Sequence, residues 1–576
     1  MSLRYRLFLL FSLSALAVFT ACGGGGSSNP PVNPPPSGSF TNSNLSGNYV
    51  FSVTGTANDS PSNDFVTIMG SFTADGSGNI TGGVLDQNST ATNGLILDTI
   101  TSGTYSVGAD GRPSGSSSVP GGLLTLQTQN SGTFLFDYVL TSSTHGLLTE
   151  FDSFGSASGS LDLQANVSQA DLNGQSYAFN FTGSSGFGTN LCGLATSGSS
   201  VPFATVGAFT LDSNGTVASG VEDFNNNCTS SGSTNLAITG GDIDLSTLPG
   251  TAALTTGTGT SAITYTFDVY PIDPTHLKFI EIDTQPMLAG DAFTQTSSIP
   301  SGNNVFTMAG FDIALGGPFT AAGIFDFDSN GNIKSDSVED VNDAGSIGEV
   351  GSIAGGPAIT AISPPLTGGR TEITFVTGFV NGNNGLACSS DCIFAAYPST
   401  GGLQMLEIDD AGATSGIAYA QTGTILASGE GFGMNMTGVT TNSAEDDIAQ
   451  FTNNNGSFSG IIDINDQGAT SFKNSYSAAY AADSAVPGRG SISPNNFGFF
   501  LTTYVVDSST AVAVSSDQTF VGLGSLAQQN SSARSNAVAN HLSMLRVSAS
   551  GRMGKSTARN APQIHSSKQG TTPRSK

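Results

Sequence analysis

One short segment occurs four times in this chain of 576 residues, and it constrains the fold more than any other feature. Its clearest copy reads Gly323-Ile-Phe-Asp-Phe-Asp-Ser-Asn-Gly-Asn-Ile333. Two alternating apolar runs flank a turn of Asp, Asn and Gly, residue types that tolerate the left-handed backbone of tight turns. The segment therefore predicts a β-hairpin. The four copies begin at Gly70, Gly207, Gly323 and Phe451.

Each hairpin leads into an Asp-x-Asn step, and these steps measure the length of the repeat. Successive steps lie about 120 residues apart, which is too long for a solenoid unit and long enough for a domain. A second acidic step, Glu-x-Asp, follows a late aromatic strand in the first three repeats. The Asp-x-Asn steps begin at Asp86, Asp223, Asp340 and Asp463, and the Glu-x-Asp steps begin at Glu150, Glu281 and Glu407.

The order of strands and turns predicts the fold class. The first repeat holds about eight strand candidates separated by turn signals, and no amphipathic helix. Consecutive strands joined by tight turns pair as neighbours, and eight of them can close a barrel without free edges. We predict an all-β protein of four tandem antiparallel up-and-down β-barrel-like domains of about eight strands each, with β-sandwiches or a propeller as alternatives. The expected repeats span residues 45–167, 168–298, 299–424 and 425–528.

The opening strand of the first repeat carries a family resemblance. It reads Gly47-Asn-Tyr-Val-Phe51, a Gly-x-Tyr-x-Phe pattern. In this pattern and in strand count the repeats resemble the calycin-type barrels, the lipocalin and avidin group. The resemblance implies up-and-down barrels, and barrels of that group often hold an apolar ligand.

The N-terminus predicts export and a lipid anchor. A basic start is followed by an apolar run, Leu7 to Ala21, that is shorter than the roughly 20 residues of a membrane-spanning helix and fits a secretory signal. The junction Ala21-Cys22 resembles the lipobox of bacterial lipoproteins, which implies acylation of Cys22, and Gly23 behind it implies an outer-membrane destination. Ordinary cleavage after Ala21 is the alternative. Residues 1–22 are then the signal peptide, and 23–44 a Gly/Ser/Pro-rich tether.

Charge is distributed unevenly along the chain. All 43 acidic residues lie between Cys22 and residue 530, where only six basic residues occur. Such a body argues against nucleic-acid binding, which needs a basic face. The segment 529–576 carries only basic charges and is rich in Ser, Gly and Asn, so we predict a disordered tail.

One turn invites a metal-binding interpretation. Asp326, Asp328 and Asn330 alternate as oxygen ligands do at the start of a calcium-binding loop. The position of the usual bidentate Glu is Ser337, however, and the corresponding turns of the other repeats share only turn-forming residues. We expect a plain hairpin turn, with a calcium site as the weaker alternative and no cofactor.

The remaining polar residues favour structural roles. Arg112, Arg370 and Arg489 occupy corresponding Gly-Arg positions, where the second repeat has Thr251. We expect each arginine to pair with a carboxylate of its own repeat, with Glu150 and Glu407 as candidates; an anion site is the alternative. An exported compartment favours disulfides within single repeats. The expected bridges are Cys192–Cys228 and Cys388–Cys392.

Recurring pairs of carboxylates could serve acid–base hydrolysis of a polysaccharide, but a solvated strand face explains the same spacing. We therefore expect no enzyme. The sequence favours a lipid-anchored, exported bacterial surface protein, facing the periplasm or the cell surface, that acts as a non-enzymatic binding, adhesion or envelope-structural module. Its expected partners are the membrane, through the anchor, and an envelope polysaccharide or protein. Small-molecule-binding barrels and a polysaccharide-acting enzyme are the alternatives.

Overall fold

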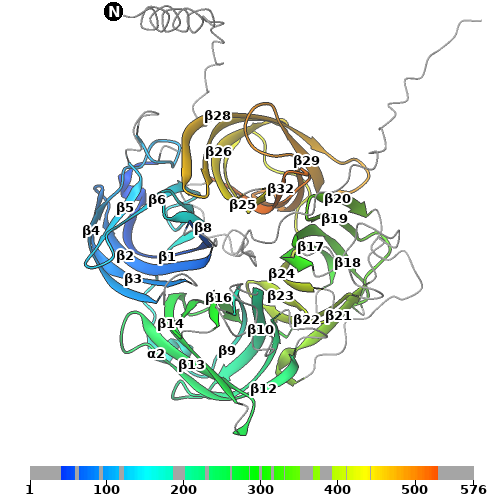
Figure 1. Cartoon of the computed structure of the whole chain (residues 1–576). Helices are drawn as coiled ribbons and strands as arrows, with labels where there is room; N and C mark the ends of the chain where they lie inside the picture. Colours follow the sequence, from blue (N-terminus) through cyan, green and yellow to red (C-terminus); the bar gives the residue numbers. More distant parts are fainter. Residues whose placement is uncertain are drawn as a thin grey trace, which may run out of the picture. The chain divides into compact units, whose positions relative to one another are not determined.

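Alternating apolar residues form antiparallel strands in four consecutive groups of eight (Figure 1). The structure is a computed structural model, and its described part lies within one compact unit, residues 35–576. The described residues are 40–58, 64–89, 95–115, 122–185, 202–226, 233–259, 262–283, 286–297, 301–312, 317–329, 331–350, 367–375, 392–409, 412–441 and 443–529.

Barrel 1 is a closed sheet in which each strand pairs with the next and β8 pairs with β1. The short 3-10 helix η1 (Asn42–Asn44) precedes it. Its strands are β1 (Ser46–Ala57), β2 (Asp64–Asp75), β3 (Asn79–Ser89), β4 (Ile96–Thr104), β5 (Leu124–Thr128), β6 (Thr133–Leu140), β7 (His145–Glu150) and β8 (Gly155–Leu163).

Barrel 2 repeats this order and closes between β16 and β9. A single helical turn, α2 (Gln169–Leu172), leads into it, with the Ser168 amide and hydroxyl both bonded to the Asp171 carboxylate. Its strands are β9 (Ser176–Ser184), β10 (Pro202–Leu211), β11 (Val217–Asn225), β12 (Ser233–Asp244), β13 (Gly250–Thr256), β14 (Ile263–Asp273), β15 (His276–Glu281) and β16 (Met287–Thr294).

Barrel 3 has the same strand order, but its β20 and β21 are not paired in the described part of the chain. The 3-10 helix η3 (Thr367–Gly369) precedes β21. Its strands are β17 (Gly302–Asp312), β18 (Gly317–Phe327), β19 (Val338–Asp343), β20 (Ser346–Val350), β21 (Thr371–Phe375), β22 (Cys392–Ser399), β23 (Gly402–Glu407) and β24 (Gly412–Ala420).

Barrel 4 is closed again, with β32 against β25. Its strands are β25 (Glu430–Thr440), β26 (Ala444–Asn454), β27 (Ser457–Asp466), β28 (Ala469–Ala482), β29 (Arg489–Pro494), β30 (Leu501–Asp507), β31 (Thr510–Ser515) and β32 (Phe520–Gln528).

Aromatic side chains fill the interiors of the barrels. In barrel 2 the ring of Phe181 lies 4.6 Å from that of Phe179 on the same strand and 5.1 Å from those of Phe267 and Phe279, so rings from β9, β14 and β15 meet in the middle. An eight-stranded barrel has an interior just wide enough for side chains to fill. Barrel 4 is filled in the same way, with Phe451 contacting Phe458 at 4.5 Å.

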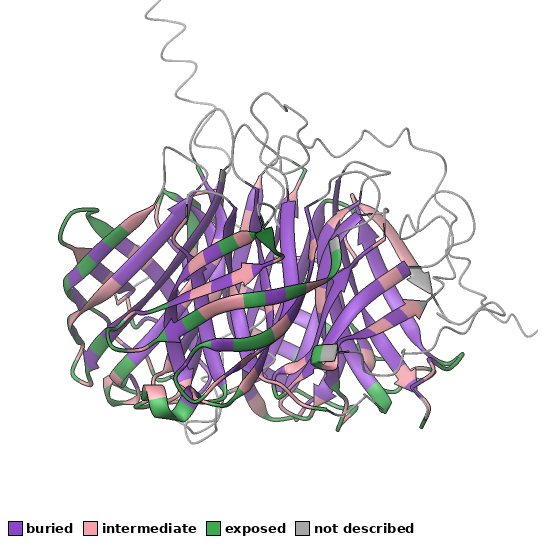
Figure 2. Ribbon diagram, turned by 90° about the horizontal axis from the view of Figure 1, so that it is seen from below, coloured by how far each residue is buried: buried purple, intermediate pink, exposed green. Residues whose placement is uncertain are grey.

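Burial differs between strands that face solvent and strands that face a neighbouring barrel. Figure 2 shows exposed and buried residues alternating along outward-facing strands. In β4, for example, exposed residues interrupt the buried ones, whereas nine of the ten residues of β10 are buried. A strand with both faces covered needs apolar or small residues at nearly every position.

The predicted fold class is confirmed: the chain is all-β, with four eight-stranded antiparallel up-and-down sheets, three of them closed as barrels. The sandwich and propeller alternatives are wrong, because first and last strands pair. The calycin-like pattern fits this strand order. The predicted signal peptide, Cys22 and most of the predicted tether and basic tail lie outside the described residues. Within the described part, no helix is long and apolar enough to span a membrane.

Replacement of Phe181 by alanine tests the filled interior. The cavity left among three other rings should cost about 3–5 kcal/mol of unfolding free energy. The measurement is the urea midpoint followed by circular dichroism. The control is F500A, whose ring is half exposed and whose loss should leave the midpoint nearly unchanged. Equal midpoints for the two variants would contradict a packed interior.

Candidate functional site at the barrel junctions

The recurring Asp-x-Asn steps lie where neighbouring barrels meet. Each step occupies the third strand of its barrel, and its aspartate is at most 6% exposed. These aspartates alternate with inward-facing residues, so they point away from the interior of their own barrel. The four aspartates are Asp86 on β3, Asp223 on β11, Asp340 on β19 and Asp463 on β27.

The asparagine of each step docks on the next barrel through its side-chain amide. The Nδ2 of Asn225 donates to the carbonyl oxygens of Glu407 (2.9 Å) and Gly412 (2.8 Å) in barrel 3. The Nδ2 of Asn465 donates in the same way to Glu150 (2.6 Å) in barrel 1. Asn88 and Asn342 make the equivalent bonds to the carbonyls of Glu281 at 2.6 Å and Ser515 at 3.1 Å.

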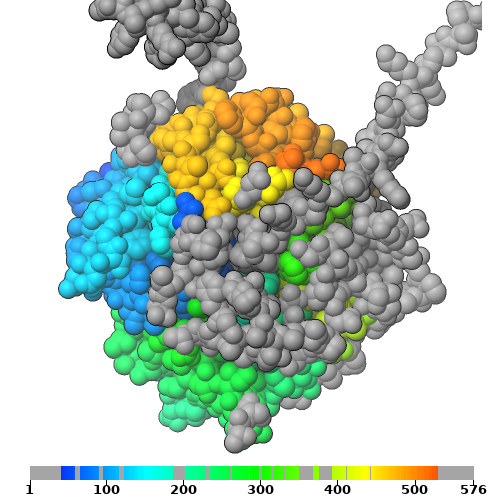
Figure 3. All heavy atoms as spheres, in the orientation of Figure 1, coloured from blue at the N-terminus to red at the C-terminus, as the bar shows by residue number. Residues whose placement is uncertain are grey.

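These contacts close a cycle, because barrel 4 docks on barrel 1 as each earlier barrel docks on its successor. Figure 3 shows the blue N-terminal barrel next to the yellow-to-orange C-terminal barrel. Each junction therefore uses one face of a barrel and a different face of its neighbour, a heterologous contact that closes after four steps.

The junction between barrels 2 and 3 is built around a buried ion pair. Arg370 donates two parallel hydrogen bonds to the Asp223 carboxylate, from Nε to Oδ2 at 2.8 Å and from Nη2 to Oδ1 at 2.9 Å. The hydroxyl of Tyr397 donates to the same carboxylate at 2.6 Å. Burial and the Asp223 charge raise the pKa of Tyr397 well above its usual value, so the hydroxyl stays a donor. The remaining terminal nitrogen of Arg370, Nη1, donates to Oε1 of Glu372 at 2.7 Å.

The junction between barrels 3 and 4 repeats this arrangement. Arg489 binds Asp340 through Nε at 2.7 Å and Nη2 at 2.9 Å, and its Nη1 bonds Asp483 at 2.7 Å. Tyr504 donates its hydroxyl to Asp340. Bidentate, charge-assisted bonds of this kind are among the strongest side-chain contacts, and they offset the cost of burying the carboxylate.

The junction between barrels 4 and 1 lacks the tyrosine, and its arginine comes from a different place. Arg112 lies in the segment between β4 and β5 and is not in register with Val139, so its expected correspondence with Arg370 and Arg489 is wrong. Arg112 of barrel 1 bonds Asp463 of barrel 4 through Nη2. Val139 stands where barrels 3 and 4 have Tyr397 and Tyr504. A second carboxyl, Asp137, lies close by, and burial together with the Asp463 charge raises its pKa well above the usual range.

The junction between barrels 1 and 2 keeps the tyrosine and lacks the arginine. Tyr270 donates its hydroxyl to Asp86 at 2.5 Å. Burial, and then the neighbouring Asp268 carboxyl, raise the pKa of Asp86 to about 8, because two carboxyls in a buried site cannot both ionise cheaply. Gly250 pairs with Val269, so the residue in register with Tyr270, where the arginine would stand, is Pro249 rather than Thr251.

The expected ion pairs are therefore corrected in one respect. Each arginine lies against the junction aspartate of the preceding barrel, which was not expected, while Arg370 and Arg489 also pair with a carboxylate of their own barrel, Glu372 and Asp483. The arginine and the junction aspartate both point outward from their barrels, so these two groups meet across a junction. Glu150 and Glu407 contribute through their backbone carbonyls, which accept from Asn465 and Asn225.

Apolar side chains surround the polar contacts. A separate buried cluster lies at each junction, and the largest joins barrels 3 and 4, with Ile324 and Tyr419 packed among residues that include Val512. At about 25 cal/mol per Å² of apolar surface removed from water, such clusters supply much of the contact energy. The polar groups specify which surfaces meet.

A glutamine that the sequence analysis did not single out contributes to all four junctions. It follows the last strand of its barrel, and its Nε2 donates to a backbone carbonyl of the next barrel. Gln164 reaches Pro271 at 2.9 Å, Gln421 reaches Val505 at 2.7 Å, and Gln529 reaches Leu140 at 2.9 Å. At the junction of barrels 2 and 3 the glutamine is Gln295, whose Nε2 donates to the Gly368 carbonyl. Aligning the ends of the repeats would have revealed this position.

At the candidate calcium site, the carboxylates of Asp326 and Asp328 are bonded to other residues of the same turn. The Asp328 carboxylate accepts the Asn332 amide at 2.9 Å, and Asp326 pairs with Lys334 at 2.7 Å; Asn330 lies outside the described residues. Asp75 of the first repeat also binds its own turn, and bonds from the Asn79 side chain and amide lower its pKa to about 2. No group of three or more His, Cys, Asp or Glu in the described part is arranged to hold a metal.

Most of the cysteines lie outside the described residues. Cys392 is buried at the start of β22 and is disulfide-bonded. Its expected partner, Cys388, and the pair Cys192 and Cys228 lie outside the described residues. Both bridges therefore stay predictions.

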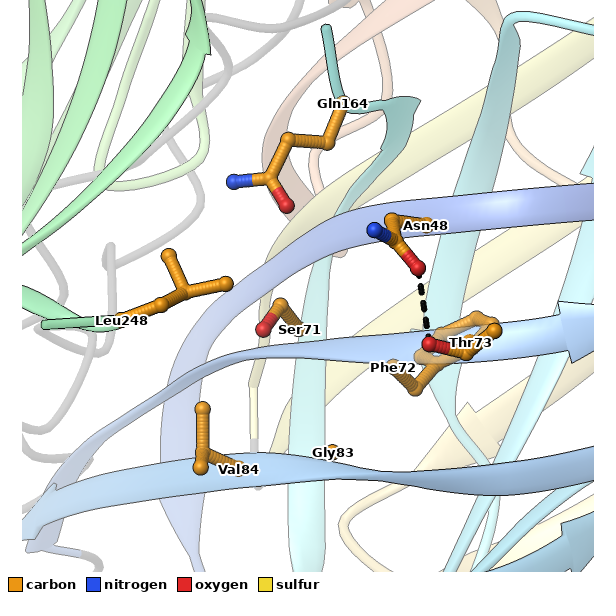
Figure 4. A pocket seen from close by; sticks show the side chains of 8 residues that line it. All are labelled: Asn48, Ser71, Phe72, Thr73, Gly83, Val84, Gln164 and Leu248. Atoms are coloured by element: carbon orange, nitrogen blue, oxygen red, sulfur yellow. Dashed lines mark hydrogen bonds between the residues drawn. The ribbon is translucent and has the colours of Figure 1, made fainter. Parts of the chain in front are cut away.

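A small pocket lies beside the junction of barrels 1 and 2 (Figure 4). Asn48, Ser71 and Thr73 line it from barrel 1, and the exposed Leu248 forms its wall from barrel 2. The Thr73 hydroxyl donates to Oδ1 of Asn48 at 2.7 Å, so two polar groups of the pocket wall are bonded to each other. Its volume of about 200 Å³ is below the several hundred Å³ of typical small-molecule sites, so we assign it no ligand.

In barrels 2 and 3 the residue directly before the junction aspartate is an inward-facing glutamate. In barrel 2, Glu222 accepts the Thr205 hydroxyl at 2.6 Å and is also bonded by Thr256. In barrel 3 the corresponding Glu339 has no hydrogen-bond partner for its carboxyl oxygens in the described part, because Ala321 stands where barrel 2 has Thr205. Burial raises the pKa of Glu339 to about 8, so it is held neutral below that pH.

Comparison with known proteins adds little to this geometry. No protein-family model matches the chain, and no curated protein matches it. Among solved structures, it is similar to a crystal structure of a mutant of the vaccine antigen transferrin binding protein B from Haemophilus parasuis Hp5. The match has 9% identity, covers 67% of this chain and 83% of that one, and has a TM-score of 0.17. So low a score carries no inference about function.

Replacing Arg370 by methionine should destabilise the protein by about 3–5 kcal/mol, because Asp223 is left buried without its cation. The shift of the urea midpoint measures the effect. The matched control is K334M, whose partially exposed pair with Asp326 is worth at most about 1 kcal/mol. A midpoint unchanged in both variants would rule out a structural role for the buried pair.

Replacing Glu339 by glutamine should change the response to pH. The folded-state pKa of about 8 lies above the unfolded value of 4.5, so the neutral form is retained in the folded chain up to about pH 8, and stability falls as pH rises from the unfolded value toward 8. A pKa difference of one between the two states corresponds to about 1.4 kcal/mol. Urea midpoints should therefore fall less between pH 5 and pH 9 in E339Q than in the unmodified chain; an identical fall would refute the assignment.

Proposed function

We propose that this chain is an exported, lipid-anchored bacterial surface protein whose four barrels form a non-enzymatic scaffold. In this role the tether presents a rigid unit away from a membrane, and the outward faces of the barrels bind or support other envelope components. An envelope polysaccharide or protein is the proposed partner.

One observation carries this proposal: the recurring polar residues hold the barrels to one another. Arg112, Arg370 and the four Asp-x-Asn steps are buried between barrels, Arg489 is largely covered there, and the carbonyls of the Glu-x-Asp steps accept bonds from the asparagines. A chain that needs the same contact at each junction explains why these residues recur. A repeated solvent-exposed ligand site would instead leave them accessible.

The filled interiors weigh against the small-molecule alternative. The ring of Phe181 lies 5.1 Å from the rings of Phe267 and Phe279 on other strands of barrel 2, and these rings occupy the space that a lipocalin-like ligand would need. The polysaccharide-acting enzyme is weakened for another reason. An acid–base pair must reach its substrate, whereas Asp223, Asp340 and Asp463 are buried and bound to arginines.

The anchor is tested by expressing the full chain in a Gram-negative host and determining the mass of the mature N-terminus. The expected result is a chain that begins at an acylated Cys22 and fractionates with the outer membrane, while C22S is not acylated and leaves that fraction. An unmodified chain that begins at Cys22 would show ordinary secretion and overturn the anchor.

The scaffold role is tested by titrating the purified chain with a fluorescent apolar probe and by co-sedimentation with purified envelope polysaccharide. We expect no saturable binding of one probe per barrel. Stoichiometric probe binding that F181A enlarges would favour ligand-holding barrels instead.

A further inference from the structure

At each of its two junctions, barrel 1 lacks one of the two partners that the junction aspartate has at the other junctions. The junctions between barrels 2 and 3 and between barrels 3 and 4 each combine one junction aspartate with an arginine and a tyrosine. Each junction of barrel 1 lacks one of these two partners and gains a second buried carboxyl in its place.

The apolar contacts differ in the same direction. Among the described residues, the cluster between barrels 3 and 4 contains twelve buried side chains and that between barrels 2 and 3 contains nine. The cluster between barrels 1 and 2 contains six, and that between barrels 4 and 1 contains four. Both junctions of barrel 1 therefore bury less apolar surface, so less free energy is available there to offset the cost of burying charge.

The groups that act on the two carboxyl pairs can be named. Asp86 on β3 faces Asp268 and Tyr270 on β14. Asp137 on β6 faces Asp463 on β27 and Arg112.

In the described part of the chain no cation is bonded to the first pair, since Lys278, in register with Tyr270, bonds Asp291. In the second pair Arg112 bonds Asp463, and Lys473, whose amide also bonds Asp463, directs its Nζ to the Gly115 carbonyl of barrel 1. Each pair is therefore compatible with burial only while it retains a proton.

A second polar group at the junction of barrels 1 and 2 opposes separation. His145 bonds Asp162 at 2.8 Å in barrel 1, and Asp291 accepts from Lys278 at 3.0 Å and contacts His276 at 2.6 Å in barrel 2. Although burial acts to raise it, these basic groups together hold the pKa of Asp162 below its usual value.

We infer that barrel 1 separates from barrels 2 and 4 as a folded unit when its two carboxyl pairs lose their protons, while barrels 2, 3 and 4 stay joined. The cycle is then a closed state of acidic to neutral solution and an open state of alkaline solution. Opening exposes the Tyr270 face of barrel 2 and the Asp463 face of barrel 4. The inference does not depend on the lipid anchor or on a partner.

The experiment is small-angle scattering of the purified chain between pH 6 and pH 9.5, with far-ultraviolet circular dichroism at each pH. The radius of gyration should increase at the alkaline end while the dichroism stays constant. The double variant D86N/D137N, which cannot lose these protons, should keep the radius of pH 6 throughout. The matched control E339Q removes a buried carboxyl that also titrates near pH 8 but lies inside barrel 3, and it should expand like the unmodified chain.

Hydrogen exchange of the unmodified chain gives a second test that needs no variant. At pH 9.5, corrected for the intrinsic rate, protection should fall in β7 and β15 at the junctions of barrel 1 and persist in β22 and β31 at the other two junctions. An unchanged radius up to pH 9.5, an equal expansion of D86N/D137N, or a uniform loss of protection at all four junctions would each overturn the inference.

Discussion

The structure depends on burying an aspartate between two barrels without leaving its charge unpaired. An isolated carboxylate in such a place would cost several kcal/mol. Two nitrogens of Arg370 and the hydroxyl of Tyr397 bond Asp223. The corresponding groups of Arg489 and Tyr504 bond Asp340. With the charge compensated, the apolar faces on either side can close, and each barrel gains a fixed neighbour.

This requirement also explains why the barrels recur in sequence. A head-to-tail contact needs two complementary faces on every barrel, so the residues that form both faces are repeated. Asn465 docking on Glu150 uses the same pair of positions as Asn225 docking on Glu407, although one contact joins the first and last barrels and the other joins barrels that are consecutive in the chain. The two incomplete junctions flank barrel 1, which makes the cycle unequal in strength.

Much of the fold could be predicted from the sequence because strand periodicity and turn chemistry are local. The Asp75 turn, with its own side chain bonding the amides of Ser77 and Asn79, is specified by a handful of consecutive residues. The junctions could be predicted only in part. The Gly-Arg steps at Arg112, Arg370 and Arg489 indicated buried ion pairs, but the repeat that supplies each carboxylate could not be read from a single repeat. The recurrence of Gln164 and its counterparts at the ends of the repeats was visible in the sequence, but the carbonyls that they bond belong to the neighbouring barrel and were not.

The sequence by itself determined the all-β class, the eight-stranded units and the residues available for pairing, since each follows from alternation and from Gly, Asn and Asp in turns. Only the tertiary structure decided which surfaces meet. Closing a sheet sends alternate residues outward, and an outward Asp223 cannot reach an outward arginine of its own barrel. Its partner must come from the next barrel, as Arg370 does. The same closure turned a repeated Asp-x-Asn step, which could have served as a solvated strand face, into the contact that joins four barrels.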